Sequence, residues 1–559
     1  MILLQLDLEE WRDSAVLVLG AYLLVLLGIG WYGWRRGTGQ AEDYYLAARS
    51  QGWVVSSLTI MATFFSSFAL LGAPGLAYKE GVVFVLFGLN PLMAGASVYF
   101  LGSRIHRLGR ALRAVTPGDL LARYYDSPRA IRLLVALVGL LYAVPYVVMQ
   151  INAGGILSEV LFPGADHAFE WGAIGLSIVT MFYIMIGGMR SVAWSDVLQG
   201  LLLLGGMLMA GVATVCALGG IGGFFESVSK LPPKSLSAPG TTGSWTPAKL
   251  VTVCLFASLG SMVQPAQWMR FYAADSVRTL RRSAMIFGLV LPICFLSGGM
   301  LVGIGGQALY PLVDEQGEYR VDENGAMLPH PDVGETAASF DRILVLVLRE
   351  ELPALMGPVG AIMALLVIVA IMAASMSTAD SNLHASSAVL TRDVWKRFVR
   401  QDADEREQAW IGRAVIVGIT LVALTLILIG RRSDHFNPVA LLVQLGLLAI
   451  AFASQLLPTT VDILYLRKGS RAGAVGGLVA GLAVVFLFTP FFSLGFSGTD
   501  VGDSVLDWVA WARPLIDVGA WGLALNVVVF VVVSRFTAKP PARTIERWAA
   551  IANPKGPTE

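Results

Sequence analysis

Apolar segments long enough to cross a lipid bilayer follow one another along almost the whole sequence of 559 residues. A transmembrane helix needs about 20 mostly apolar residues, and the chain is 56% hydrophobic but only 14% charged. The runs are continuous and lack the alternation that is typical of outer-membrane barrel strands. The sequence therefore predicts an all-α membrane protein, with about thirteen transmembrane helices in a single bundle.

Charged residues are distributed unevenly among the loops that connect these segments. Arginine and lysine concentrate in four loops, at 104–132, 278–282, 392–400 and 467–471. Aspartate and glutamate concentrate in two others, at 314–335 and 500–507. Positive loops face the cytoplasm, and the first apolar run follows an acidic N-terminus that lacks the basic region of a signal peptide. We expect a multi-pass protein of the plasma (inner) membrane, with the N-terminus outside and the C-terminus in the cytoplasm.

Polar residues lie deep inside the apolar segment that runs from about residue 357 to 384. Asp380 lies one helical turn after Ser377 in this segment. One face of the expected helix carries four small residues at i, i+3, i+4 and i+7, namely Ala374, Ser377, Thr378 and Ser381. Because an ionisable residue within a span is costly and rare, we interpret this stretch as a functional site that faces the bundle interior.

A second polar cluster accompanies helix breakers in the segment at 52–77. Three hydroxyl residues lie at its centre, Thr63, Ser66 and Ser67. Gly72 and Pro74 follow before its outer end. Glycine and proline often only kink a transmembrane helix. Beside a mid-span hydroxyl cluster, however, they indicate a discontinuous helix, whose unwound carbonyls can coordinate a cation.

Five motifs are spread over most of the chain. They are ALLGAPGLAYKEG at 69–81, VTPGDLLARYY at 115–125, GGMRSVAWSDVLQG at 187–200, QPAQWMRFYAA at 264–274 and MSTADSNLHASSAVLTRDVWK at 376–396. With these motifs in this order, the chain resembles the sodium/solute symporter family, which includes sodium-coupled pantothenate, monocarboxylate, proline and sugar transporters. The first two motifs are most similar to the pantothenate and monocarboxylate branches.

The resemblance implies an APC/LeuT-like fold of two inverted five-helix repeats, with one additional helix before them and two after them. In such folds the first helix of each repeat is broken at the membrane midplane. Here these are the segment at 52–77 and the segment at 247–269, which is interrupted at Gln264 and Pro265. The chain then divides into an N-terminal extra helix and cytoplasmic loop at 1–51, a first repeat at 52–218, a second repeat at 219–458 with an outer loop and amphipathic helix at 310–356, and two C-terminal helices with a short cytoplasmic tail at 459–559.

The resemblance also implies a sodium site between the first broken helix and the segment at 357–384. Position by position, the ligands fall on backbone carbonyls or hydroxyls of five residues, namely Ala62, Phe65, Ala374, Ser377 and Thr378. Hard oxygen ligands suit an alkali cation, so Na+ is the expected coupling ion. The alternative is that the two hydroxyls only donate back to their own helix or hold helices together.

Asp196, in the motif WSDVLQ, resembles an acidic residue that some relatives place near the inner mouth. Together with Asp380 and Ser381, it is predicted to form a second cation or proton site. The alternative for Asp196 is a structural helix-end carboxylate, because it begins its expected span and is well placed as an N-cap. Phe64 stands where some relatives have a carboxylate, and this argues against the proline branch.

Nine residues are candidates for contact with the solute because we expect them to face the centre of the bundle, namely Thr63, Ser66, Ser67, Phe68, Tyr146, Gln150, Gln264, Trp268 and Gln444. Each has the alternative of packing or helix–helix contact. No lysine or arginine is expected in mid-membrane to neutralise a carboxylate, but helix N-termini and the sodium ion can hold an anion. We therefore expect a small organic anion, such as a monocarboxylate. The alternative is a neutral solute, such as a sugar or an amino acid.

The class of activity implied by the resemblance is sodium-coupled symport by alternating access, with a proton-coupled transporter as the alternative. No histidine or cysteine cluster, metal-binding spacing or nucleophile elbow indicates an enzyme. A net charge of +1 gives no reason to expect a nucleic-acid partner. The expected partners are the solute, the sodium ion and the lipid bilayer, with the protein a monomer or a homodimer.

Overall fold

The computed structural model describes residues 8–37, 40–162, 164–323, 325–336, 339–432 and 442–553. Within these ranges the chain is built from helices, and the β pairing consists of three isolated bridges. This confirms the predicted all-α class. A backbone that crosses a bilayer must satisfy its own polar groups, and a helix does so within a single segment.

The helices follow one another closely, with short 3₁₀ and π segments between some of them. The first part of the chain forms α1 (Leu8–Arg36), α2 (Ala41–Leu46), α3 (Trp53–Phe64), η2 (Phe68–Gly72), α4 (Ala73–Glu80), α5 (Val82–Val85), α6 (Asn90–Ser97), α7 (Ser103–Ala111), α8 (Pro117–Tyr124), α9 (Ala130–Leu161) and α10 (Ala168–Ala217). The middle part forms α11 (Gly220–Ser229), α12 (Pro247–Val263), α13 (Pro265–Ala273), α14 (Val277–Cys294), η6 (Phe295–Leu301), α15 (Val302–Leu309), α16 (Ile343–Met356), α17 (Pro358–Val389) and η8 (Leu390–Val399). The last part forms α18 (Glu405–Arg432), α19 (Leu442–Ser454), α20 (Leu457–Val461), η9 (Asp462–Leu466), α21 (Arg471–Leu487), α22 (Pro490–Phe496), α23 (Asp500–Ala512), α24 (Val518–Phe536) and α25 (Ala542–Ala552).

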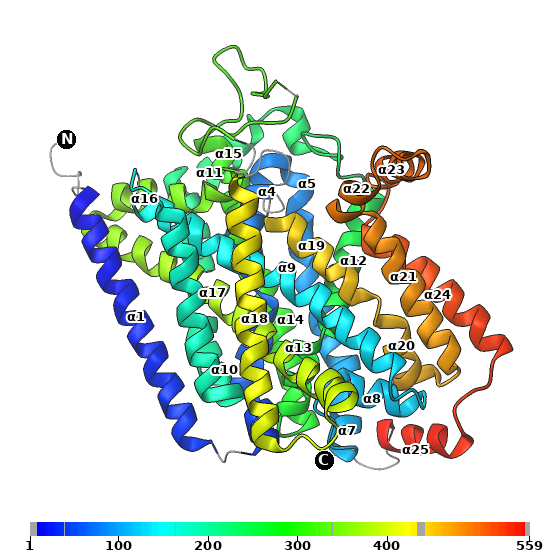
Figure 1. Ribbon diagram of the computed structural model, residues 1–559. Helices are drawn as coiled ribbons and strands as arrows, with labels where there is room; N and C mark the ends of the chain where they lie inside the picture. Colours follow the sequence, from blue (N-terminus) through cyan, green and yellow to red (C-terminus); the bar gives the residue numbers. More distant parts are fainter. Residues whose placement is uncertain are drawn as a thin grey trace.

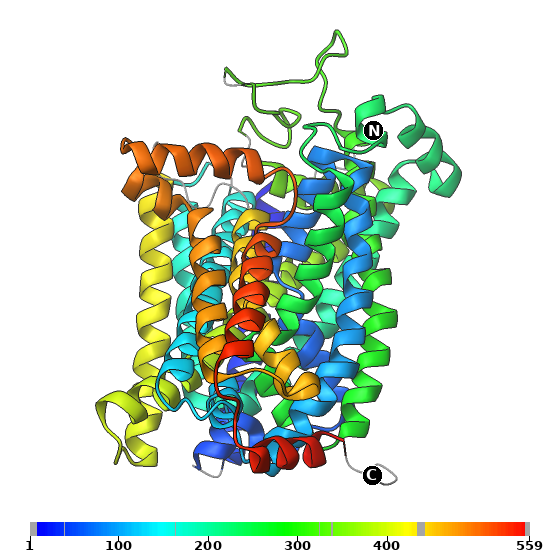
Figure 2. The same ribbon diagram turned by 90° about the vertical axis from the view of Figure 1, so that its right-hand side faces the viewer.

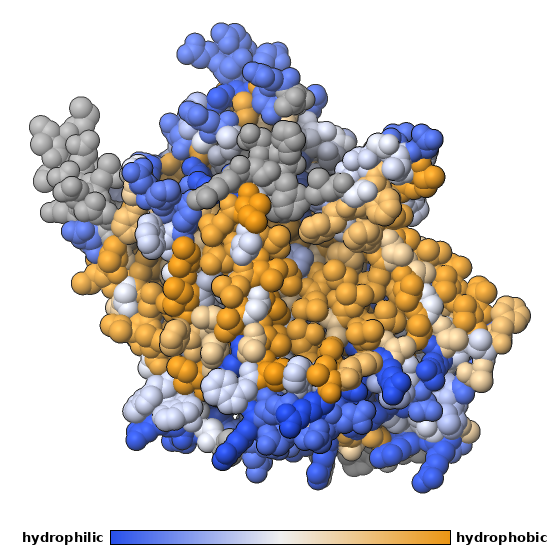
Figure 3. Space-filling view, in the orientation of Figure 1, coloured by the Kyte–Doolittle hydropathy of each residue, from blue (hydrophilic) through white to orange (hydrophobic). Residues whose placement is uncertain are grey.

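The long helices run side by side between two polar ends, with α1 at one edge of the bundle and α24 at the other (Figure 1). We call the end with α23 the upper end and the end with α25 the lower end, as they stand in Figure 1. Both of these helices lie flat across the bundle (Figure 2). On the face shown in Figure 3, apolar residues form a band around the middle and hydrophilic residues cover both ends. This distribution is the one that a bilayer requires.

Eight described helices are long and apolar enough to cross a membrane, and eleven spans result if each of three bent helix pairs is counted as one. α10 has 50 residues, which at 1.5 Å per residue is about 75 Å and exceeds the hydrocarbon thickness of about 30 Å. Its helix is interrupted at Gly188, where φ is 56° and ψ is −153°. The total of thirteen spans stays a prediction.

The structure contains the two predicted broken helices. α12 and α13 meet at 55°, and the break falls at Gln264 and Pro265 as predicted. α3 and the helix that follows it meet at 58°, but here the predicted position is wrong. The break falls at Phe65 and Ser66, whereas Gly72 and Pro74 lie within the continuous stretch of η2 and α4. Pro74 follows the π segment η2 directly, and such local changes of the helical hydrogen bonds allow a proline within a transmembrane helix.

α17 is the central helix of the bundle. It packs against α3, α9, α10, α13, α16 and α18, and 72% of its most apolar window is buried inside the protein. A helix that is apolar on all sides is expected in such a place. α16, within the region predicted to contain an amphipathic helix, packs its apolar residues against α17 and α10. The polar residues in the second half of α17 therefore face other helices and not lipid.

Candidate functional site

The break after α3 leaves backbone carbonyls without helical partners beside α17. α3 ends one residue before Phe65, which is extended, so nearby carbonyls lose the donors that a continuing helix would supply. The hydroxyl of Ser377 donates to the carbonyls of Ala62 at 3.2 Å and Ala374 at 3.1 Å. The hydroxyl of Thr378 donates to the carbonyls of Ala62 and Phe65, at 3.2 and 3.0 Å. The position of the break therefore determines which backbone carbonyls the hydroxyls of α17 contact.

These contacts bring the oxygens of all five predicted sodium ligands into one cluster. Each of the five residues is at most 1% exposed. Carbonyl and hydroxyl oxygens are hard, uncharged ligands, which fit an alkali cation better than a transition metal. Among the described residues, no group of three histidine, cysteine or acidic side chains could hold a metal ion. Ser377 does donate back to its own helix, but both hydroxyls also reach across to α3, so the site residues fit sodium.

A buried arginine adjoins this cluster. Arg270, near the end of α13, is 1% exposed, and its Nη2 lies 3.2 Å from Oδ2 of Asp196 on α10. The guanidinium also donates to the hydroxyl of Thr59, at 3.0 Å, and to that of Ser381. The Thr59 hydroxyl in turn donates to Asp196. A buried charge is stable only when it is paired and hydrogen-bonded, so Arg270 and Asp196 depend on each other.

The structure rejects one alternative and corrects one expectation at this point. Asp196 is not an N-cap, because it lies inside α10, well past the interruption at Gly188. No arginine was expected within the membrane, but α12 and α13 together form one bent span, and this span contains Arg270. Its charge is tolerated because Asp196 compensates it. The available signal was an arginine that follows a predicted helix break within two turns.

Asp380 and Ser381 connect the arginine to the cluster of predicted sodium ligands. Asp380 accepts hydrogen bonds from the hydroxyl of Tyr183 at 2.6 Å and from that of Ser381 at 3.1 Å. The Ser381 hydroxyl also lies 2.5 Å from the carbonyl of Ser377. The three residues predicted to form a second cation site therefore belong to one network. In this network Arg270 already supplies one positive charge.

Five of the nine candidate solute residues lie at the junction of the first broken helix and α9. The N–H and the hydroxyl of Ser67 donate to Oε1 of Gln150, at 3.1 and 2.8 Å. The Gln150 amide donates to the carbonyl of Tyr146 at 3.2 Å. The hydroxyl of Ser66 accepts from the N–H of Phe68 at 3.2 Å. Polar groups of this kind, set among apolar walls, are typical of small-molecule sites.

The other four candidates lie outside this junction. Thr63 joins the arginine network, because its hydroxyl lies 3.1 Å from that of Ser381. Gln264 caps α13, with its Oε1 accepting from a backbone N–H two residues ahead at 2.6 Å. Trp268 is fully buried, edge-on to a tyrosine ring of the same helix. Gln444 is exposed and lines a cavity nearer the upper end.

Comparison with known proteins decides the family. A model of the Sodium:solute symporter family matches residues 44–481, which include both broken helices and all of α17. The chain belongs to this family. The resemblance inferred from the five motifs is therefore confirmed, and sodium is the coupling ion. Members of the family are transporters and not enzymes.

Individual relatives of the symporter are distant but cover most of its length. The high-affinity proline transporter PutP of Bacillus subtilis (strain 168) is 27% identical over 472 residues, covering 83% of this chain and 89% of that protein. The sodium/proline symporter of Staphylococcus aureus (strain bovine RF122 / ET3-1) is 26% identical over 550 residues, covering 94% and 93%. Identities of this size leave the solute of this symporter undetermined.

Solved structures show the fold of the symporter. The substrate-bound outward-open state of a Na+-coupled sialic acid symporter matches with a TM-score of 0.69 at 20% identity, covering 95% of this chain and 98% of that one. The nucleobase-cation-symport-1 transporter Mhp1, in a closed conformation with bromovinylhydantoin bound, matches with a TM-score of 0.50 at 14% identity, covering 91% and 98%. These are LeuT-fold transporters, so the predicted fold class is confirmed.

The symporter has a cavity of about 910 Å³ toward its upper end. On α9 the cavity reaches Pro145 and Val148, which flank the solute candidate Tyr146 in the sequence. Its walls come from α4, α9, α12 and α19, and from residues next to α22 and α24. The cavity thus shares α9 with Tyr146 and Gln150, although neither of these residues lines it.

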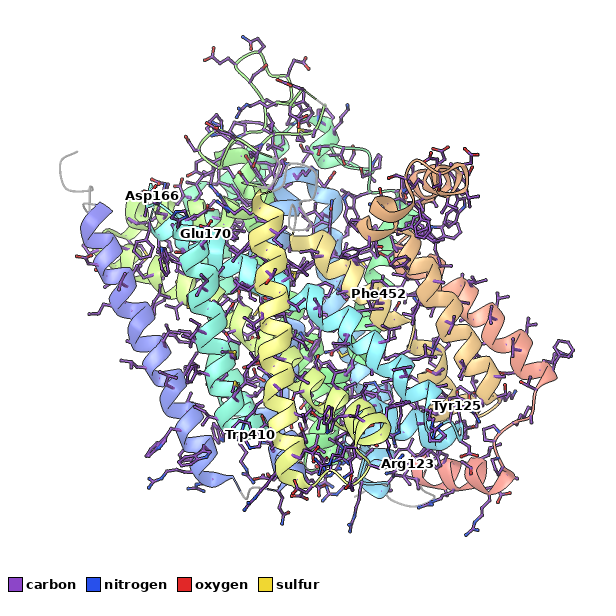
Figure 4. The ribbon with its side chains drawn as sticks, in the orientation of Figure 1. Arg123, Tyr125, Asp166, Glu170, Trp410 and Phe452 are labelled. Carbon is purple, nitrogen blue, oxygen red and sulfur yellow. The ribbon has the colours of Figure 1, made fainter. Side chains whose placement is uncertain are left out.

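A second buried arginine lies at the lower end of the symporter. Arg132, in the first turn of α9, has its Nη2 3.0 Å from Oδ1 of Asp119, and its Nη1 pairs with Asp393 on η8. The positive loop predicted at 104–132 includes Arg132, which the structure instead places in α9, where it is only 3% exposed. Figure 4 shows Arg123 and Tyr125, which belong to the same segment as Asp119, at this end of the bundle. We call these three paired residues the lower cluster.

Asp119 also begins a helix. Thr116 and Asp119 form a capping box at the start of α8, in which each side chain binds the backbone N–H of the other residue. Burial opposes the charge of Asp119, but Arg132, Arg392 and the N–H of Val115 outweigh burial and hold the pKa of Asp119 below its ordinary value. The motifs VTPGDLLARYY and SSAVLTRDVWK each contribute one carboxylate to the lower cluster, which was not predicted from the sequence.

Proposed function

We propose that the symporter imports a small organic anion, such as a monocarboxylate, together with sodium by alternating access. The observation that supports it most is that two hydroxyls of α17 meet the carbonyls freed by the break after α3. In this proposal the ion is held by the oxygens of Ala62, Phe65, Ala374, Ser377 and Thr378. The solute lies beside Ser67 and Gln150.

Sodium drives import because its binding joins two parts of the bundle. An ion held by oxygens of both α3 and α17 favours the arrangement in which these helices stay together, and only such differential affinity can shift a conformational equilibrium. Each sodium ion that moves inward gains about 2.3 kcal/mol per 100 mV of membrane potential, in addition to its concentration gradient.

The lower end faces the cytoplasm in this proposal, as the arginine-rich loops near α7, α8 and η8 require. The cavity toward the upper end is then the entrance for the solute. An anion would be attracted by the sodium ion itself and by the N-terminal ends of the half-helices that start at Pro265 and Phe68.

A second cation is the further part of this proposal. Asp196 and Asp380 are both buried in the network of Arg270, so two carboxylates share one arginine. A second sodium ion beside Asp380 and Ser381 would balance the remaining charge. The alternative occupant of this second site is a proton, carried by Asp196 or Asp380.

The test is uptake by purified protein in proteoliposomes with an imposed inward sodium gradient. Monocarboxylates, pantothenate, proline and neutral sugars are offered separately, with choline replacing sodium in parallel vesicles and with a pH series. We expect uptake of an organic anion that depends on sodium and not on the proton gradient. Sodium-driven uptake of neutral solutes alone would reject the anion and leave the coupling intact.

The matched variants test the ion site. Ser377→Ala with Thr378→Ala should lower the apparent affinity for sodium at least tenfold. The control is Ser375→Ala, because Ser375 lies on the same helix, is equally buried and donates only to the carbonyl of Ile371 at 3.0 Å. Sodium activation that stays unchanged in the double variant would refute the proposed ligands.

A further inference from the structure

We infer that the outer cavity is a second solute-binding site, which takes organic carboxylates between Lys249 and Arg513 before they reach the central junction. This inference rests on the proposed function for its choice of solute class. It adds a separate binding step on the path from the upper end. The outer site would hold a solute molecule while the central site is empty.

The size and the walls of the cavity suit a small organic molecule. Its volume of about 910 Å³ lies within the range of roughly 300 to 1,000 Å³ of small-molecule sites. Apolar side chains form much of the lining, among them Val144, Val148, Leu445, Leu448 and Val253. A solute with an apolar body therefore finds contact area here, and specificity must come from the charged residues.

The carboxylates of the cavity already have partners. Glu80 is 3% exposed and accepts hydrogen bonds from the hydroxyl of Thr242, at 2.8 and 2.7 Å, and from its N–H at 3.3 Å. Asp517 accepts from the N–H of Gly519 at 2.7 Å, as the N-cap of α24. Neutral protein donors thus bind both acidic groups without cancelling their charge, and the cationic side chains of the cavity outnumber the two carboxylates.

The basic groups of the cavity have no close carboxylate partner, although Glu80 and Asp517 lie near enough to Lys249 to act on its charge. Four cationic side chains line it, namely Lys79, Lys234, Lys249 and Arg513. Among the described residues, none of the four has a carboxylate oxygen within the 4.0 Å of an ion pair. Arg513 donates from Nη2 to the carbonyl of Phe488 at 3.1 Å, and its other N–H groups remain for a ligand. The unused hydrogen-bonding capacity of the cavity is therefore cationic.

Lys249 is the group best placed to receive a carboxylate. It lies in the first turn of α12, and its Nζ is 5.1 Å from the centre of the Trp245 ring. The indole is held in turn by Phe84, edge-on at 5.0 Å between ring centres. Low-dielectric walls strengthen the field of the cations within a cleft. An aromatic wall beside a cation provides one contact for the body of an organic acid and one for its carboxylate.

The test is binding of benzoate to the purified full-length protein, followed by saturation-transfer NMR, with uncharged benzamide as the matched ligand. We expect benzoate to bind and benzamide to bind at least fivefold more weakly. Lys249→Gln and Arg513→Gln should each weaken benzoate at least fivefold, and Lys249→Arg should restore it. The control Lys230→Gln, which changes an exposed lysine paired with Glu226 outside the cavity, should have no effect.

Three outcomes overturn the inference. Benzoate binding that survives both glutamine substitutions would place the ligand elsewhere, as would binding that is lost in Gln150→Ala alone. If inorganic phosphate competed for the site as strongly as benzoate binds it, the cavity would recognise negative charge alone and not an organic carboxylate. These outcomes are distinct from a failure of the proposed function, because the binding assay needs no transport and the uptake assay needs no outer site.

Discussion

The two buried arginines of the symporter have similar charges around them but different neighbours. Arg270 pairs with Asp196 and, through Ser381, adjoins Asp380. Arg132 pairs with Asp119 and Asp393. In each case one guanidinium is set against two buried carboxylates, and in each case one of the carboxylates lies on the continuous helix formed by α17 and η8.

The neighbours of each arginine distinguish their roles. Around Arg270 the remaining partners are hydroxyls and backbone carbonyls, and Ser381 connects them to the predicted sodium ligands through the carbonyl of Ser377. Around Arg132 the remaining partner is the capping box that starts α8. An arginine paired with two carboxylates therefore does not by itself identify an ion site. Uncharged hydroxyl and carbonyl oxygens beside the charges identify it.

Replacement of each arginine by glutamine should give the largest effects. Removal of one partner of a buried ion pair costs about 3 to 5 kcal/mol, so both variants should unfold at lower temperature in detergent. We expect Arg270→Gln also to lose sodium-driven uptake, because Ser381 and Thr59 lose their donor. Arg132→Gln should retain the wild-type sodium dependence in whatever protein remains folded. The lysine variants of both positions serve as controls, and equal sodium dependence of the two glutamine variants would remove the distinction.

An intermediate effect is expected from the same substitution at two places on one helix. Asp380→Asn should raise the sodium concentration for half-maximal uptake about tenfold, which corresponds to about 1.4 kcal/mol, because Asp380 adjoins the network of Ser381. Asp393→Asn should change this concentration less than twofold. Sodium titration of uptake in proteoliposomes measures both. A larger sodium effect at Asp393 would show that the lower cluster takes part in ion binding.

The smallest effect is expected from Asp119→Asn, and it should depend on pH. The pKa of Asp119 is held below its ordinary value in the fold, so its charge stabilises the fold above the unfolded pKa of about 4. This contribution is lost as pH falls through the folded pKa. The variant should therefore lose roughly 1 kcal/mol at pH 7.5, because Arg132 keeps its pairing with Asp393, and the difference should persist to about pH 4 and shrink only below it. Thermal unfolding at several pH values measures it.

The exposed Asp126 provides the control for this pH series. Asp126→Asn should leave the unfolding temperature unchanged at every pH. A difference between wild type and Asp119→Asn that stays constant as pH falls from 7.5 to well below 4 would mean that the charge of Asp119 does not stabilise the lower cluster.

Much of the fold was predictable because a bilayer permits few solutions. Long apolar runs had to be helices, and Pro265 marked the second break correctly because proline itself prevents the helix from continuing. The first break was placed too late. Phe65 and Ser66 are not helix breakers. Phe65 is extended, and the hydroxyls of Ser377 and Thr378 accommodate the carbonyls that the break frees. A local pattern of residues cannot contain that tertiary contact.

The candidate site, like the fold, was predictable only in part. The spacing of Ser377, Thr378 and Asp380 revealed a polar face within a span, and the structure brings those residues to the first broken helix. Arg270 and Arg132 were missed as buried residues because each lies near a helix end, where an arginine ordinarily reaches solvent. Only their pairing with carboxylates more than ten residues away in the sequence explains their burial.

The continuous helix of α17 and η8 acts as a lever. Thr378 and Asp393 are fifteen residues apart on it, which corresponds to about 22 Å at 1.5 Å per residue. A tilt of about 10° at the ion ligands would move Asp393 by about 4 Å, more than the length of a hydrogen bond. Contacts at the lower end are therefore sensitive to small rotations at the ion, and the two ends of this helix cannot rearrange independently.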